Sequence, residues 1–243
     1  APTMGRGLVR SPQPGLQLAR GMIIVASSVC FVNALRLMPL AEATAINYTT
    51  PTLVILLSVL ILKERMTRPR WAFVVAGAVG MLLIVRPGAA IFHGGAVFAL
   101  AAALFYAAFQ IMTRKLAAED PRVTLFYPAL VGTVLMTLVL PFVEWPADMP
   151  RGDVAQVVLA GALGTAGHFL FILAFQRAPA SGLTPFTYMQ IVFATLLGWA
   201  LFGQFPDGTA LAVMAIIAGS GLLLAWHERR SALAATPEPT AVD

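Results

Sequence analysis

Polar side chains interrupt two long apolar stretches of this sequence, and they are the residues best suited to chemistry. The first run consists of Thr44, Asn47, Tyr48, Thr49 and Thr50, and the second of Thr184, Thr187, Tyr188 and Gln190. A polar group in hydrocarbon costs free energy unless it is hydrogen-bonded or faces a cavity. Two interpretations therefore stay open. The side chains line a cavity that binds a small molecule, or they bond to the backbone and to neighbouring helices.

Three further residues could contribute to such a site. Pro51 has no N–H, so the carbonyl of Asn47 is left as a free acceptor about one turn earlier. Tyr106 and Gln110 lie one turn apart in another apolar stretch and could face the same cavity. His168 is the only ionisable residue that we expect well inside an apolar span. It could bind substrate or exchange a proton, or be a neutral side chain bonded to a neighbouring helix.

The elements that position these residues follow from composition, since 59% of the 243 residues are hydrophobic and only 11% are charged. A soluble domain carries about 25% charged residues. The apolar runs approach the roughly 20 residues that cross a bilayer as a helix. They predict eight spans: 21–37, 43–62, 71–85, 94–113, 123–143, 154–175, 182–203 and 209–226. Residues 1–20 are expected to form an irregular loop, and residues 231–243 a disordered tail.

The basic residues predict the orientation. If the eight spans alternate in direction, thirteen of the sixteen Lys and Arg residues fall on one side. That side is then cytoplasmic, with both visible termini, in a multi-pass protein of the cell (plasma or inner) membrane. This pattern accounts for the positive net charge without nucleic acid. Cys30 is the single cysteine, and no metal-ligand spacing, P-loop or HExxH motif occurs, so we expect no metal, no cofactor and no enzyme.

An internal repeat relates the two polar runs. At an offset of 140 residues, positions 34–57 share six identities with positions 174–197, among them the pair Tyr48 and Tyr188. The repeats would divide the chain into residues 1–90, with three spans, and residues 91–230, with five. Two helices are accordingly expected to precede residue 1. Because five spans per repeat is an odd number, the two repeats would be inverted in the membrane.

Two strings are similar to a known family. The string MPLAEATAINYTTPTLVILLSVLILKERMTRPRW and the later PFTYMQIVFATLLGWALFGQFPD resemble EamA-type transporters of the drug/metabolite transporter superfamily. The resemblance implies an all-α, polytopic transmembrane helical bundle with two inverted five-helix repeats, of which eight of ten helices are present here. Many relatives carry a Glu after the Phe-Gly that ends the ninth helix, whereas this chain has Gln204 and retains Glu64 in the first repeat.

The sequence thus predicts a secondary transporter that moves a small metabolite or drug-like compound by alternating access. The predicted substrate-binding residues are Asn47, Tyr48, Thr44, Thr184, Thr187, Tyr188, Gln190 and His168. The expected partners are a small-molecule substrate, the lipid bilayer and a possible second copy of the chain. The alternatives are a non-transporting membrane scaffold or a membrane-embedded enzyme. An enzyme would need clustered Asp, Glu, His or Ser near one interface, and the acidic residues of the outer loops are widely spread.

Overall fold

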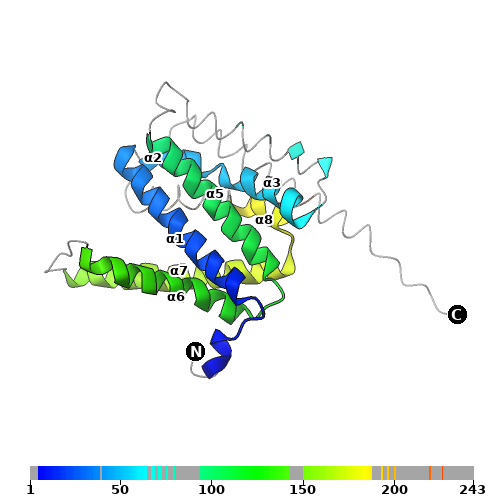
Figure 1. Cartoon of the computed structure of the whole chain (residues 1–243). Helices are drawn as coiled ribbons and strands as arrows, with labels where there is room; N and C mark the ends of the chain where they lie inside the picture. Colours follow the sequence, from blue (N-terminus) through cyan, green and yellow to red (C-terminus); the bar gives the residue numbers. More distant parts are fainter. Residues whose placement is uncertain are drawn as a thin grey trace.

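The computed structural model is a bundle of helices that describes residues 5–38, 40–64, 67–68, 71–72, 75, 79, 94–142, 150–187, 193, 196, 200, 219 and 226 (Figure 1). All regular structure within these ranges is helical. The helices are α1 (Pro14–Leu37), α2 (Leu40–Asn47), α3 (Thr50–Leu62), α5 (Gly94–Lys115), α6 (Pro121–Val139), α7 (Arg151–Arg177) and α8 (Ala180–Thr187). A 3-10 turn, η1 (Gly5–Val9), precedes α1, and a second one, η3 (Leu140–Phe142), extends α6.

Membrane-spanning length is reached by four of the described helices. These are α1, α5, α6 with its η3 extension, and α7, each long and apolar enough to cross a bilayer. The all-α, multi-pass architecture predicted from composition is therefore confirmed. The predicted spans 71–85 and 209–226, and the part of 182–203 that follows Thr187, lie almost entirely outside the described residues.

The start of the first span is corrected by the structure. We expected a loop up to residue 20 and a helix from Gly21, but α1 begins at Pro14. Proline is favoured at the first helical position, because its fixed backbone angle suits a helix and its missing N–H would have no partner there. The loop prediction is therefore wrong from Pro14 onward, and Arg20 belongs to a helix rather than to a solvated segment.

Helices α1 and α5 pack side by side in opposite directions (Figure 1). Near one end of the pair, Arg20 Nε donates to Thr113 Oγ1 at 2.8 Å. Further along, Ser27 Oγ donates to the carbonyl of Ala102 at 2.9 Å. The residue numbers rise along α1 as they fall along α5, so the helices are antiparallel, as strict alternation of consecutive spans across a membrane requires for this pair.

Arg20 is a buried charge that joins three helices. It is fully buried, and its Nη1 donates to the carbonyl of Thr124 in α6 at 2.6 Å. Its guanidinium carbon lies 4.4 Å from the centroid of the Phe109 ring in α5, within the range of a cation–π interaction. A buried charge persists only when such contacts compensate for lost hydration. Arg20 therefore fixes the N-terminal part of α1 against α5 and α6.

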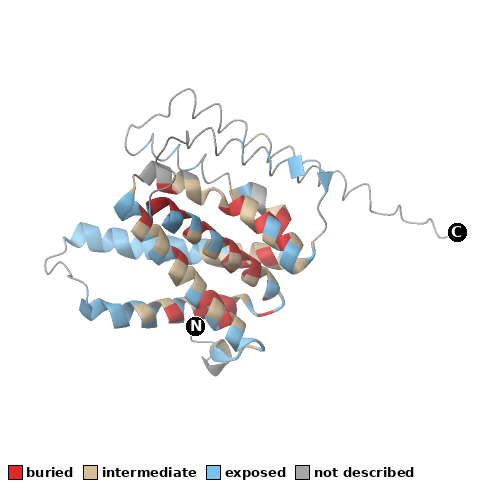
Figure 2. Ribbon diagram, turned by 45° about the horizontal axis from the view of Figure 1, so that its top comes forward, coloured by how far each residue is buried: buried red, intermediate tan, exposed pale blue. Residues whose placement is uncertain are grey.

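The outer surface of the bundle is apolar, as lipid contact requires. Residues 151–167 of α7 are all exposed, whereas buried residues concentrate where α1, α3 and α5 meet (Figure 2). The exposed side chains of α7 include Val157, Leu163 and Leu170. In water this would be an unusually large apolar patch, but in a bilayer such a surface contacts the lipid hydrocarbon.

Candidate functional site

The helix that carries the first polar run is broken in the middle. We expected one span over residues 43–62, but α2 ends at Asn47 and α3 begins at Thr50. At the break the Thr49 N–H bonds to the carbonyl of Ile46 at 3.0 Å, only three residues earlier. The Thr49 hydroxyl donates to the same carbonyl at 2.8 Å. Pro51 offers no N–H to Asn47, so the broken turn leaves backbone and side-chain polar groups available at this depth.

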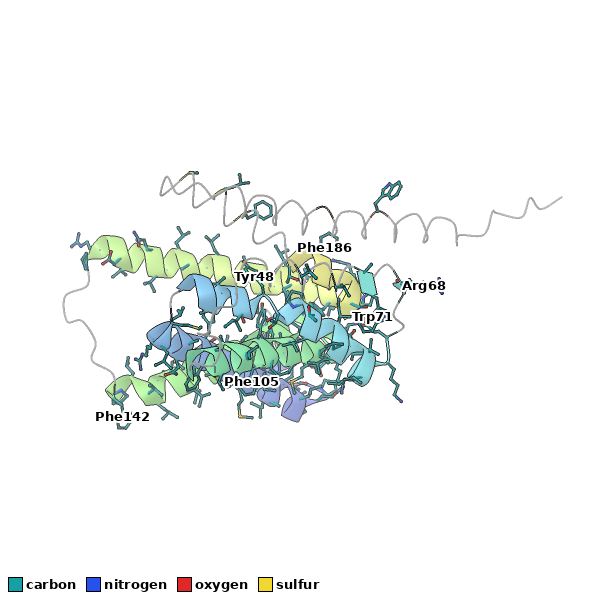
Figure 3. All side chains as sticks on the ribbon, turned by 90° about the horizontal axis from the view of Figure 1, so that it is seen from above. Tyr48, Arg68, Trp71, Phe105, Phe142 and Phe186 are labelled. Atoms are coloured by element: carbon teal, nitrogen blue, oxygen red, sulfur yellow. The ribbon has the colours of Figure 1, made fainter. Side chains whose placement is uncertain are left out.

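A cavity of about 290 Å³ lies beside this break. Tyr48, which sits at the break, lies in the middle of the helices in Figure 3, far from Phe142 in η3. The cavity is lined by residues of α1, α2, α3, α5 and α8 and of the break: Phe31, Thr44, Asn47, Tyr48, Thr50, Pro51, Tyr106, Gln110 and Thr187. Helices that are far apart in the sequence thus line one space, and this space lies at mid-height in the bundle because Tyr106 is at the centre of α5.

Half of the predicted binding residues come together here. Thr44, Asn47, Tyr48 and Thr187 all line the cavity, although Thr187 is more than 130 residues from the other three in sequence. Tyr188, Gln190 and the side chain of Thr184 lie outside the described residues. Whether the four lining residues contact a substrate stays a prediction.

His168 is not among the residues that line the cavity. Its ring lies on α7, 6.0 Å from the centroid of Phe109 and 6.3 Å from that of Phe171. Its Nδ1 is 3.2 Å from the carbonyl of Gly164, one turn earlier in the same helix. The sequence left open a histidine bonded to a neighbouring helix, whereas here the polar contact of the ring is to its own helix.

One wall of the cavity is held rigidly. Tyr106 stacks on Phe109, with ring centroids 5.9 Å apart and an angle of 11° between the planes. Phe109 is fully buried, stacks in turn against Phe171 at 6.3 Å, and carries the Arg20 guanidinium on its ring. Aromatic pairs at such distances stabilise each other's orientation beyond simple burial. The Tyr106 ring therefore presents a supported aromatic surface to the cavity.

The sequence placed Tyr106 and Gln110 only as possible cavity residues, and it missed Phe31. Phe31 lies in α1 and is partly buried against a cluster of small residues, Ala34, Ala43 and Ala99. No signal in the sequence separates it from the other apolar residues of α1. Its position facing the cavity depends on how α1 is rotated about its own axis, and packing rather than sequence spacing sets that rotation.

An apolar cluster packs next to the cavity-lining residues of α3 and α5. Val54 of α3 packs with Ala107 and Ile111 of α5, Phe175 of α7 and Ala180 of α8. All five are at most 2% exposed. On α3, Val54 lies one turn beyond the lining residue Thr50, toward the end of the bundle where α3, α5 and α7 finish and α8 begins. We call this end the basic end, because it carries Lys63, Arg114, Lys115, Arg122 and Arg177.

Glu64 joins the two halves of the chain at the basic end. Its carboxylate accepts the N–H groups of Ala180 and Ser181, at 3.0 and 3.1 Å, and the Ser181 hydroxyl at 2.6 Å. These are the first residues of α8, where a negative charge is favoured by the helix dipole. Lys63 adopts a left-handed backbone conformation with φ 55° that ends α3 and turns the chain toward Glu64.

Comparison with known proteins decides the family. The model of the EamA-like transporter family matches residues 7–86 and again residues 93–226. The chain belongs to this family. It is therefore a membrane transporter protein rather than an enzyme, as the sequence predicted.

Named relatives support the same assignment. The chain is 24% identical over 229 residues to the S-adenosylmethionine uptake transporter of Rickettsia conorii, which covers 93% of this chain and 77% of the relative. It is 27% identical over 234 residues to the riboflavin transporter of Vibrio cholerae, covering 94% and 78%. It is also 27% identical over 209 residues to the pseudopaline exporter of Pseudomonas aeruginosa, covering 86% and 73%.

A solved crystal structure shares the fold. It superposes with a TM-score of 0.75 at 22% sequence identity, over 93% of this chain and 80% of the other. At this identity the likeness concerns the fold alone. It places the described helices within an architecture already observed for another chain.

Proposed function

We propose that this protein is a secondary transporter that binds a small polar metabolite in the cavity beside the helix break and moves it by alternating access. The observation that carries the proposal is the position of the cavity. Polar residues from separate parts of the chain meet beside an interrupted helix, at mid-height in a bundle of membrane-spanning helices. Transporter sites lie near the bilayer midplane on discontinuous helices, because the broken turns expose polar backbone to the substrate.

The two halves of the chain provide the moving parts in this proposal. The family model matches the chain twice, and the matches divide it close to residue 90, where the repeat predicted from sequence also divides it. We propose that the parts are inverted repeats, 1–90 and 91–230, which rock against each other around the cavity. In the cell membrane the basic end would face the cytoplasm, following the distribution of Lys and Arg.

We propose that the present arrangement is closed toward the basic end. The apolar cluster around Val54 and Phe175 and the contact of the Glu64 carboxylate with the start of α8 are the structural features that would form this closure. Alternating access requires such a closure to open while its counterpart at the other end forms. We propose that the Glu64 contact is the cytoplasmic gate, made in the outward-facing state and broken in the inward-facing one.

The names of the relatives agree with a small polar substrate. They include uptake of S-adenosylmethionine, transport of riboflavin and export of pseudopaline. The cavity of about 290 Å³ is near the lower end of the roughly 300–1,000 Å³ typical of small-molecule sites. A metabolite fits this space, whereas a protein or nucleic acid does not.

Asn47 gives the sharpest test of the site. Purified protein in proteoliposomes would be screened for uptake of radiolabelled metabolites, including riboflavin and S-adenosylmethionine. For a transported compound, Asn47→Ala should weaken binding roughly 5- to 150-fold, because a buried polar group of the substrate loses its partner. Asn33→Ala is the matched control, since Asn33 bonds to the Val29 carbonyl of its own helix at 2.8 Å and does not line the cavity. Equal affinities of the two variants would exclude the cavity as the substrate site.

A further inference from the structure

The contacts of Arg20 converge on one residue of α5. Its guanidinium carbon lies 4.4 Å from the centroid of the Phe109 ring. Its Nε donates to Thr113 Oγ1 at 2.8 Å, and the Thr113 hydroxyl donates in turn to the Phe109 carbonyl at 2.7 Å. Arg20 therefore contacts the ring of Phe109 directly and its backbone carbonyl through one intervening side chain.

The Arg20 guanidinium is itself held in place. Its Nη1 donates to the carbonyl of Thr124 in α6 at 2.6 Å, and both Arg20 and Phe109 are fully buried. The N–H donors of a guanidinium form a rigid planar fork, so hydrogen bonds to two different helices leave it little freedom. The charge is thus fixed over the Phe109 ring in a desolvated setting, where a cation–π interaction is strongest.

Phe109 connects this charge to the cavity. Its ring stacks on that of Tyr106, one turn earlier in α5, with 5.9 Å between the centroids and 11° between the planes. On α7 it contacts the rings of His168 and Phe171, at 6.0 and 6.3 Å. Tyr106 lines the cavity. Because stacked rings constrain each other's orientation, a change in the Phe109 ring is passed to a residue of the cavity wall.

We propose that Arg20 is a positioning residue of the transport site, which holds the Tyr106 ring through Phe109 in the orientation that the substrate contacts. The proposal rests on the proposed function, because it takes the cavity to be the substrate site. It assigns a role in transport to a buried charge of α1. Arg20 belongs to the first proposed half of the chain and Tyr106 to the second, so the contact crosses the boundary between the halves.

A fluorine label tests the positioning without a ligand. The chain contains four tyrosines, so incorporation of 3-fluorotyrosine into the full chain in lipid nanodiscs gives four fluorine NMR signals. The Tyr106 signal is the one that Tyr106→Phe removes. Arg20→Met keeps a long side chain and removes the charge. It should shift the Tyr106 signal, because the shielding by the Phe109 ring changes with the ring's orientation. In a Phe109→Leu background the same substitution should cause no shift.

Gln17→Met is the matched control. Gln17 lies three residues before Arg20 on α1 and is also fully buried. Its Nε2 donates to Glu119 at 2.8 Å and to Thr124 Oγ1 at 3.3 Å, so its loss weakens the helix contacts without removing a group from the ring stack. This variant should lower the melting temperature and leave the Tyr106 signal in place. If Arg20→Met does not fold, Arg20→Lys replaces it, because lysine keeps the charge and loses the planar fork.

Affinity shows whether the positioning matters for transport. Equilibrium binding of radiolabelled riboflavin and S-adenosylmethionine would be measured on the same nanodiscs. For a probe that binds, Arg20→Met should weaken the affinity about 5- to 30-fold, the range expected for a desolvated cation–π contact. In a Tyr106→Ala background the same substitution should have no further effect, because its route to the cavity is gone. A general structural defect would weaken binding equally in both backgrounds.

Two results would overturn the proposal. One is an unchanged Tyr106 signal in the Arg20 variant, and the other is an equal loss of affinity with and without the Tyr106 ring. Failure of the proposed function gives a different result, in which Asn47→Ala leaves transport unchanged. If neither probe binds, the fluorine signals decide, since an unshifted Tyr106 signal refutes the positioning and a shifted one supports it.

Discussion

Removal of the Glu64 carboxylate should open the basic end of the transporter. The carboxylate accepts three hydrogen bonds from Ala180 and Ser181, and all three would be lost in Glu64→Ala. The contact joins the end of α3 to the start of α8 across the two halves of the chain. The substitution therefore destabilises the closed arrangement without removing any bond inside either helix.

The magnitude follows from the contacts. A hydrogen bond to a charged group stabilises by about 1.5–3 kcal/mol. A carboxylate at a helix N-terminus adds about 0.3–1 kcal/mol. Because Glu64 is partly exposed to solvent, we expect the total to be about 2–3 kcal/mol. That corresponds to a roughly 30- to 150-fold rise in the population open at the basic end. Glu64→Gln keeps one acceptor oxygen and one of the backbone contacts, so it should give a rise of about fivefold, or about 1 kcal/mol.

Labelling of a buried cysteine measures this population. Ala180 is fully buried beside Glu64, and Cys30 is the chain's single cysteine, so Ala180→Cys in a Cys30→Ala background gives one reporter. Its rate of reaction with a small thiol reagent should rise by the same factor as the open population when closing is faster than labelling. Asp120→Asn is the control, because Asp120 is an exposed carboxylate at the same end that caps α6 through the Arg122 N–H at 2.7 Å. Equal labelling rates with and without the Glu64 carboxylate would refute the gate.

Two further predictions concern orientation and packing. The basic end is predicted to be cytoplasmic. A cysteine that replaces exposed Arg68 should therefore be protected from impermeant reagents in intact cells, and one that replaces exposed Arg151 should react. The reverse pattern would show that the predicted topology is inverted. Gly21→Ala should lower the thermal stability, because the added methyl group would lie 2.8 Å from the Val131 side chain of α6. Gly161 has no described atom within 4 Å of such a methyl group. Gly161→Ala should therefore raise the stability by up to about 1 kcal/mol, because alanine has the higher helix propensity. Equal melting temperatures for the two glycine variants would contradict the close approach of α1 and α6.

Several features of this protein could be predicted from the sequence because they depend on local composition. A bilayer requires about twenty apolar residues per helix, and that requirement can be read from each segment separately. The polar run at Asn47 and Tyr48 stood out for the same reason, since polar groups are rare at that depth. Even the broken turn had a local signal in Pro51, although one continuous span was expected there and the structure shows α2 and α3.

Tertiary structure decided which of these residues meet. Helix rotation is set by packing, so the sequence could not show that Phe31 faces the cavity while His168 does not line it. The capping of α8 by Glu64 joins residues 116 or more positions apart, and no local pattern encodes that contact. Arg20 was expected in a solvated loop because a charge near an apolar segment usually marks its end. Only the contacts with Thr113 and Phe109 of α5 and with Thr124 of α6 make its burial possible.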